Sequence, residues 1–91
     1  MTPSTPPKGI EQLVEKEVSA LSPDLHAQWM SISVVPARLT SDVVLLARRD
    51  SRVLGYDEAE EEFGTGELDG AGKLRDWGTW GERLAWALPH L

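Results

Sequence analysis

The chain has no cysteine among its 91 residues. Disulfide bonds, thiol catalysis and metal sites built on thiolates are therefore excluded. A small protein without these groups is typical of the reducing cytosol, so we expect a cytoplasmic protein. Long apolar runs are also lacking, because the longest uncharged stretch, residues 25–37, contains Pro36 and is shorter than the about 20 residues of a membrane-spanning helix. We expect neither a signal peptide nor a transmembrane segment.

Groups suited to catalysis or metal binding are few and scattered. His26 and His90 lie far apart in the sequence and belong to no cluster with the spacing of metal ligands. Residues 64–73 are rich in glycine, but five residues separate Gly66 from Gly72 where a phosphate-binding loop has four. The serines lack the strand–turn–helix setting of a catalytic nucleophile. We therefore expect a protein that is not an enzyme and that binds no cofactor and no metal.

Basic residues are outnumbered by acidic ones, and the formal net charge is −6. The segment from residue 57 to residue 69 has no basic residue and seven acidic ones, which are Asp57, Glu58, Glu60, Glu61, Glu62, Glu67 and Asp69. A surface of this charge repels nucleic acid and attracts basic proteins. The simpler interpretation is a solvated strand edge that is protected from pairing with other chains. We expect a basic protein partner, and neither nucleic acid nor a membrane.

Apolar residues recur with helical spacing near the N-terminus. The stripe consists of Ile10, Leu13, Val14, Val18 and Leu21. It predicts a helix that begins near Gly9, with Glu17 as a charged misfit on the apolar face. Ser22 is a favourable N-cap and Pro23 suits the first helical position, so a second, short helix is expected over residues 23–30.

After the second helix the spacing changes to that of strands. The expected strands are rich in β-branched or aromatic residues and are residues 32–35, 43–49, 52–56 and 73–77. Pro36 either ends the first of them or places it at a sheet edge. Residues 57–62 suit a helix or a charged edge strand, and both interpretations stay open. Phe63 and Leu68 are expected to be buried.

The C-terminal segment has the pattern of a helix. Thr79 and Glu82 have the spacing of a capping box, and Pro89 is expected to stop the helix. The chain is therefore predicted to be α+β, with N-terminal helices, an antiparallel meander of three to five strands and a C-terminal helix packed on one sheet face. Residues 1–8, which are rich in proline, are expected to form a disordered N-terminal tail, and residues 9–91 a single α+β domain.

Four tryptophans are more than so small a core can bury completely. Trp86 falls off the helical stripe of Trp80, Leu84 and Leu88, and we expect Trp86 and Trp77 to be exposed. An exposed tryptophan beside acidic residues is typical of a protein-binding surface. The expected partner-binding residues are Asp57, Glu58, Glu60, Glu61, Glu62, Trp77 and Trp86.

Two segments carry a family resemblance. In residues 52–63 an apolar strand ends in Tyr56 and is followed by acidic residues. Residues 77–88 have the pattern of an aromatic-led helix that closes the domain. Both segments resemble the later half of small bacterial SMI1/KNR4-like (SUKH) immunity proteins. The resemblance implies that the protein neutralises a toxin by direct binding, without catalysis.

The sequence thus predicts a small, acidic, non-enzymatic, cytosolic protein-binding domain of bacterial immunity or inhibitor type that docks a basic partner. The alternative is a structural or regulatory domain that self-associates, for example as a homodimer, through residues 32–35 or through a tryptophan surface. A third interpretation, a small enzyme or ligand-binding domain, would require a deep pocket lined by carboxylates in an apolar setting.

Overall fold

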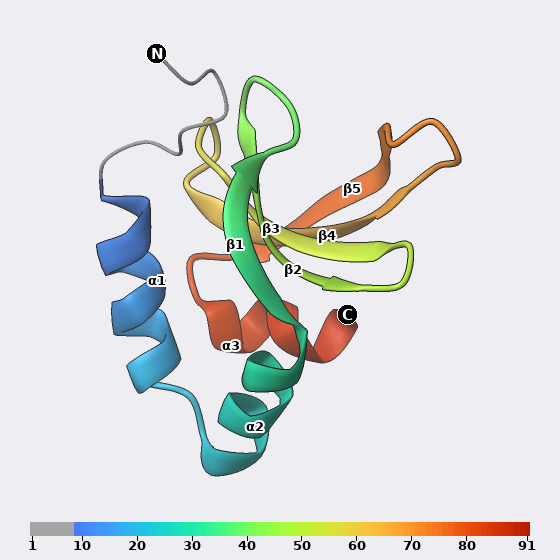
Figure 1. The fold of residues 1–91 in the computed structure, drawn as a ribbon. Coiled ribbons are helices and arrows are strands. Elements are labelled where there is room, and N and C mark those ends of the chain that lie inside the picture. The colour runs from blue at the N-terminus through green and yellow to red at the C-terminus, as the bar shows by residue number, and fades with distance from the viewer. Residues whose placement is uncertain (1–8) are drawn as a thin grey trace.

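The chain folds into two layers in the computed structural model, which describes residues 9–91. Helices cover one face of a five-stranded antiparallel sheet with the strand order β1-β2-β3-β4-β5 (Figure 1). The helical elements of the described residues are α1 (Ile10–Ser19), α2 (Pro23–Ile32), α3 (Leu84–Ala87) and the 3-10 turn η1 (Leu88–His90). The strands are β1 (Ser33–Arg38), β2 (Val43–Arg49), β3 (Arg52–Asp57), β4 (Glu62–Leu68) and β5 (Leu74–Gly81). The predicted α+β fold is confirmed, while the predicted tail, residues 1–8, lies outside the described residues.

The two N-terminal helices begin where local signals place them. The Ser22 Oγ accepts a hydrogen bond from the backbone N–H of Leu25 at 3.4 Å, and Pro23 occupies the first turn of α2. Helix α2 continues beyond residue 30 and ends at Ile32, which is buried together with Trp29. None of the helices in residues 9–91 is long and apolar enough to cross a membrane.

Glu17 explains how a charge fits on the apolar stripe of α1. Its side chain is buried, with a residue exposure of 5%. Its Oε1 accepts a hydrogen bond from the backbone N–H of Leu84 at 3.1 Å, and its Oε2 accepts one from Arg83 at 3.1 Å. The Glu17 carboxylate thereby satisfies an N–H group in the first turn of α3, where the N-cap residue Arg83 supplies no side-chain cap of its own. The misfit residue therefore ties α3 to α1.

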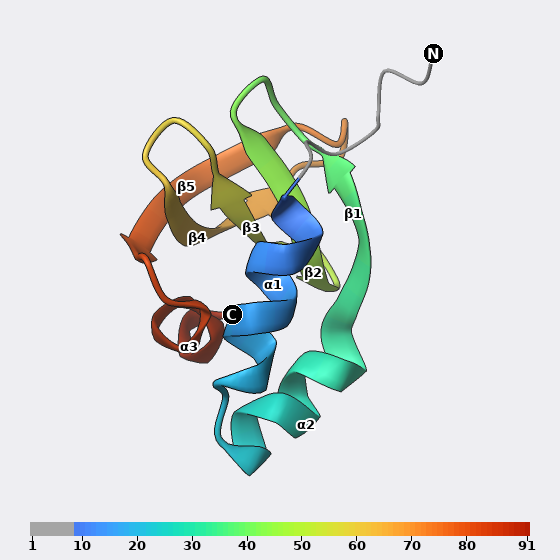
Figure 2. The ribbon, with the colours of Figure 1, turned by 90° about the vertical axis from the view of Figure 1, so that its left-hand side faces the viewer.

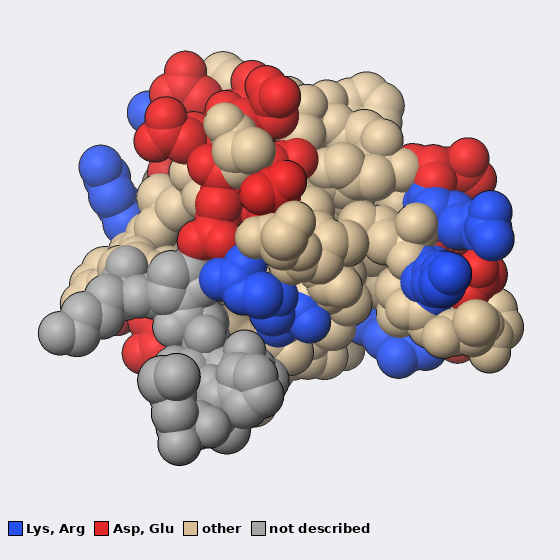
Figure 3. Space-filling model, turned by 90° about the horizontal axis from the view of Figure 1, so that it is seen from above, with Lys and Arg blue, Asp and Glu red and all other residues tan. Residues whose placement is uncertain are grey.

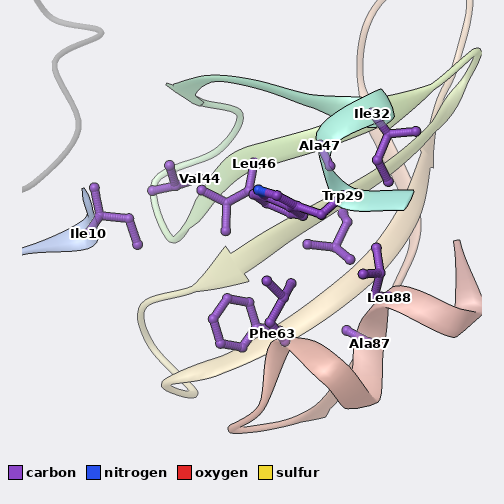
Figure 4. Close-up of a cluster of buried hydrophobic side chains, with 11 residues drawn as sticks. Ile10, Trp29, Ile32, Val44, Leu46, Ala47, Phe63, Ala87 and Leu88 are labelled. Atoms are coloured by element: carbon purple, nitrogen blue, oxygen red, sulfur yellow. The ribbon is translucent and has the colours of Figure 1, made fainter. Parts of the chain in front are cut away.

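The core lies between the helices and the covered face of the sheet. Figure 4 shows Leu46 and Phe63 from the strands, Trp29 from α2 and Leu88 from the C-terminal segment within one cluster. Complete burial of a leucine or phenylalanine side chain stabilises a fold by roughly 1.5–3 kcal/mol per residue. The predicted burial of Phe63 is confirmed, whereas Leu68 at the end of β4 is only half-buried.

The sequential strand order is that of the predicted meander, but several predicted strand bounds are wrong, and β4 is not among the predicted strands. Strands β2 and β3 form a hairpin, with Arg49 opposite Arg52 across a two-residue turn, as the two-residue gap between the predicted strands 43–49 and 52–56 indicates. Strand β1 forms one edge of the sheet and runs through Pro36, whose missing N–H is tolerated at an edge. Residues 73–77 belong to the longer strand β5, which begins at Leu74.

The prediction of a helix from Thr79 onward is wrong. The backbone stays in β5 as far as Gly81, and the helix begins only at Leu84. Trp77 and Trp80 therefore lie on a strand, and the predicted capping box is absent. Pairing with β4 satisfies a row of backbone groups in β5, and this set of hydrogen bonds outweighs the single local cap that the sequence favours.

Candidate functional site

The acidic segment forms the turn that joins β3 to β4. Asp57 at the end of β3 pairs with Glu62 at the start of β4, so residues 57–62 are neither a helix nor an edge strand. Asp57 is buried, and its Oδ1 accepts hydrogen bonds from the backbone N–H groups of Ala59 at 3.0 Å and Glu60 at 3.1 Å. The structure therefore places Asp57, a predicted partner-binding residue, inside the turn that it shapes.

Trp77 also has a structural position. Its Nε1 donates a hydrogen bond to the Oδ2 of Asp57 at 3.1 Å. Its ring lies against glycine backbone, since a Cβ at Gly64 would come within 2.6 Å of Cζ2 and a Cβ at Gly55 within 3.4 Å of Cη2. Neighbours along a strand point to opposite faces, so this ring covers the sheet face opposite to Phe63 and the core. The predicted exposure of Trp77 is thus only partial, and the ring braces the sheet.

Two further acidic residues of the segment are engaged by arginines of the same chain. Glu58 Oε1 lies 2.8 Å from the Nη1 of Arg38, and Asp69 Oδ2 lies 2.8 Å from the Nε of Arg75. The hydrogen bond from the Arg75 side chain holds the pKa of Asp69 below its ordinary value of 3.8, and the hydrogen bond from the backbone N–H of Lys73 lowers it further. These carboxylates therefore serve the fold itself more than the outer surface.

The remaining carboxylates of the turn surround a hollow of about 410 Å³. We call it the acidic hollow, and its lining consists of Leu13, Tyr56, Glu60, Glu61, Glu62 and Glu82. Acidic side chains gather on the side of Figure 3 where Figure 1 places the turn between β3 and β4, while acidic and basic side chains are mixed at the opposite end. Among residues 9–91, no ion pair engages the four glutamates of the hollow.

Tyr56 brings the only phenol of the chain into the hollow. Its ring packs edge-on against Phe63, with ring centroids 5.1 Å apart. Burial raises the pKa of Tyr56 above its ordinary value of 10.0, and Glu61, Glu58 and Glu82 raise it further. The hydroxyl therefore stays protonated at neutral pH and offers one hydrogen-bond donor among carboxylates that only accept.

The chemistry of the acidic hollow suits an organic cation. Glutamate oxygens accept hydrogen bonds from a guanidinium or an ammonium group, and Leu13 and the Tyr56 ring offer apolar contact to the stem that carries it. Within residues 9–91, no group of three or more acidic or histidine side chains has the arrangement of a metal site. The lining thus offers hydrogen-bond acceptors and apolar contact to a lysine or arginine side chain.

Trp86 is exposed, as predicted, with 56% of its surface accessible. It packs against Gly81, where a Cβ would come within 2.5 Å of the indole Cε3. Gly81 directly precedes Glu82, which lines the acidic hollow, although Trp86 itself is not among the lining residues. Trp80 is 44% exposed as well, although its Nε1 donates to the Thr65 Oγ1 at 2.8 Å.

Sequence reasoning missed half of the acidic hollow. The spacing of Thr79 and Glu82 predicts a helix cap, and nothing in it indicates that β5 returns Glu82 to the turn between β3 and β4. The apolar stripe of α1 predicts that Leu13 lies in the core. Tyr56 carried a usable signal, because an aromatic residue at the end of a strand, directly before acidic residues, is expected to lie near them.

A scan of protein-family models, a search of curated proteins and a search of solved structures each found no match to this chain. The resemblance of residues 52–63 and 77–88 to SUKH immunity proteins therefore stays a prediction. In one of these segments the resemblance rests on a helix over residues 77–88, but residues 77–81 belong to strand β5.

Proposed function

We propose that this protein is a non-enzymatic, acidic binding domain of immunity or inhibitor type, which docks a basic protein in the cytoplasm through the acidic hollow. The observation that supports the proposal is that four glutamates converge on one hollow without an arginine or lysine of residues 9–91 in an ion pair with them. The resemblance to SUKH immunity proteins implies the same kind of role, with a toxin as the partner.

The charge of the hollow acts mainly on the rate of association and on partner choice. Complementary charges steer the encounter of two proteins, and this attraction weakens with salt. Individual exposed ion pairs contribute only about 0–1 kcal/mol each. The acidic hollow alone therefore does not make a tight complex, and apolar contacts must supplement it.

Trp86 is the best placed aromatic residue for such contacts. Exposed tryptophans are frequent among the residues that carry most of the energy of an interface. Trp86 packs against Gly81, the residue before Glu82, and we assign this exposed indole to contact with the partner.

The proposal is tested by affinity capture with the immobilised full-length chain in a lysate of the source organism. The test variant is Glu60→Lys/Glu61→Lys/Glu62→Lys. Capture is carried out at ionic strengths of about 0.01 M and about 0.15 M, where the Debye length is about 30 Å and about 8 Å. We expect a basic protein that is retained strongly at low salt, less at higher salt, and not at all by the variant.

The matched control is Asp24→Lys/Glu67→Lys/Asp76→Lys, which changes the net charge by the same amount at three exposed positions outside the hollow. It is expected to retain the partner with only a modest loss. Equal recovery by the test variant and the unchanged protein would contradict the proposal, and equal loss in both variants would show that net charge, not the hollow, attracts the partner.

A further inference from the structure

A second hollow lies on the other side of α1, between this helix, α2 and β1. Figure 2 shows α1 in front of the sheet, with β1 on one side of it and α3 on the other. The volume of the hollow is about 500 Å³. We call it the α1–β1 groove, and its lining includes Glu11, Val14, Glu15, Val18, Trp29 and Val34. Its size and its mainly apolar lining are those of a binding site for a side chain or a small ligand.

Exposed apolar residues lie on the elements that form the groove. Met30 of α2 is 65% exposed, and Val34 and Val35 of β1 are 39% and 85% exposed. Val34 lines the groove, whereas Met30 and Val35 do not. The groove thus offers apolar contact in addition to that of Leu13 and the Tyr56 ring in the acidic hollow.

The charges at the groove restrict what can occupy it. Glu11 and Glu15 are one helical turn apart, so both carboxylates lie along the same wall. Among residues 9–91, no lysine or arginine lines the groove. A second copy of this chain, with a net charge of −6, would bring like charges to this wall, whereas a segment with an apolar side chain and a neighbouring basic residue complements it.

Helix α1 contributes to both the groove and the acidic hollow. Leu13 lines the acidic hollow, and the next residue, Val14, lines the α1–β1 groove. A partner that contacts both sides of α1 would therefore reach both sites. The groove would supply apolar burial, and the hollow would supply charge.

We propose that the α1–β1 groove seats an apolar side chain of the basic partner, directly beside a lysine or arginine that pairs with Glu11 and Glu15. This inference rests on the proposed function, because it describes the same partner. It adds that the recognised segment is amphipathic, with an apolar anchor next to a basic residue.

The experiment is a titration of the ¹⁵N-labelled full chain with three synthetic peptides, followed by NMR. The probe is acetyl-Lys-Phe-Lys-amide, and its controls are acetyl-Lys-Ala-Lys-amide and acetyl-Glu-Phe-Glu-amide. We expect the probe to shift the amide signals of Val14, Val18 and Val34. Because the phenyl group is buried, its affinity should be about tenfold higher than that of the alanine peptide. The acidic peptide should leave these signals unchanged.

Two valines on β1 provide matched variants. Val34→Asp places a carboxylate in the groove and is expected to lower the affinity for the Lys-Phe-Lys peptide to that for the alanine peptide. Val35→Asp adds the same charge at the adjacent, more exposed position, which does not line the groove, and is expected to leave this difference in place. The amide spectrum of each variant reports whether it is folded, and Glu11→Lys/Glu15→Lys, at exposed helix positions, provides a second test that should abolish binding of the probe.

The outcomes separate the groove from the proposed function. Equal affinities for the phenylalanine and alanine peptides, no binding of either, or shifts confined to the acidic hollow would each overturn the inference about the groove. Such results would not contradict the proposed function, as long as Glu60→Lys/Glu61→Lys/Glu62→Lys still abolishes capture of the basic partner. If this variant instead retains the partner while the Lys-Phe-Lys peptide still binds in the groove, the proposed function is overturned and the inference about the groove stands.

Discussion

At the scale of single residues, the acidic segment divides into two groups with different tasks. Asp57 is buried and bonded to the turn backbone, and Glu58 and Asp69 face arginines of the same chain. Glu61 and its neighbours in the acidic hollow have no such partner among residues 9–91. A run of like charges in a sequence is therefore not a uniform surface, because each carboxylate is placed by the pairing of β3 with β4.

The ionisation of Tyr56 reports the electrostatic effect of the glutamates in the acidic hollow. It can be followed without interference, because Tyr56 is the only tyrosine of the chain. We expect its ionisation, followed by tyrosinate absorbance, to occur above pH 10.0, since burial and the nearby glutamates raise its pKa. Removal of one charge in Glu61→Gln should lower this pKa towards the ordinary value. The control Glu67→Gln, outside the hollow, should leave it unchanged.

The raised pKa of Tyr56 also predicts a pH dependence of stability. The folded state disfavours the ionised phenol, so the stabilising contribution is complete below pH 10.0 and is lost as the pH rises through the higher folded-state pKa. Urea unfolding of Tyr56→Phe should show less loss of stability in this range than unfolding of the unchanged protein. An identical alkaline loss in both would contradict this cause.

At the scale of elements, the sequence was informative wherever a signal acts within one turn of chain. The Ser22–Pro23 start of α2 and the hairpin of β2 and β3 are local, and both were predicted. The helix from Thr79 was also a local signal, but distant backbone groups of β4 compete for the same residues and decide the outcome. The acidic hollow joins α1, β3, β4 and the residue after β5, and no local pattern contains that arrangement.

Helix α3 is an element that depends on another one. It comprises a single turn, Leu84–Ala87, which is too short to be stable alone. The carboxylate of Glu17 on α1 caps it from across the core. Glu17→Ala should therefore lower the free energy of unfolding by about 1–3 kcal/mol, because a buried N–H group loses its acceptor.

The variant Glu17→Gln separates the contribution of the hydrogen bond to Leu84 from that of the ion pair with Arg83. Its amide oxygen can still accept from the backbone N–H of Leu84, whereas the ion pair with Arg83 is lost. Since Arg83 is more than half exposed, we expect Glu17→Gln to be clearly more stable than Glu17→Ala in urea unfolding. Equal destabilisation by both variants would show that the ion pair, and not the cap, holds α3.

At the scale of the whole molecule, the structure bears on whether the chain associates with itself. Each edge strand of the sheet is irregular. The register of β1 with β2 shifts between Ser33 and Ala37, and the register of β5 with β4 shifts twice. Pro36 lies in β1, and Asp76 of β5 has a φ of 54°. Bulges, proline and charge at an edge all hinder pairing with a second sheet.

We therefore expect a monomer of 10.0 kDa in sedimentation equilibrium, from micromolar to millimolar concentration. The measurement at low and high salt separates two causes, because salt screens the repulsion between chains of net charge −6 but leaves the irregular edges in place. A monomer at both salt concentrations would show that the irregular edge strands prevent self-association. Dimers that form only at high salt would show that charge repulsion prevents it. Dimers at both salt concentrations would instead favour self-association through β1 or the exposed tryptophans. A second copy of the chain would then be the occupant of the α1–β1 groove.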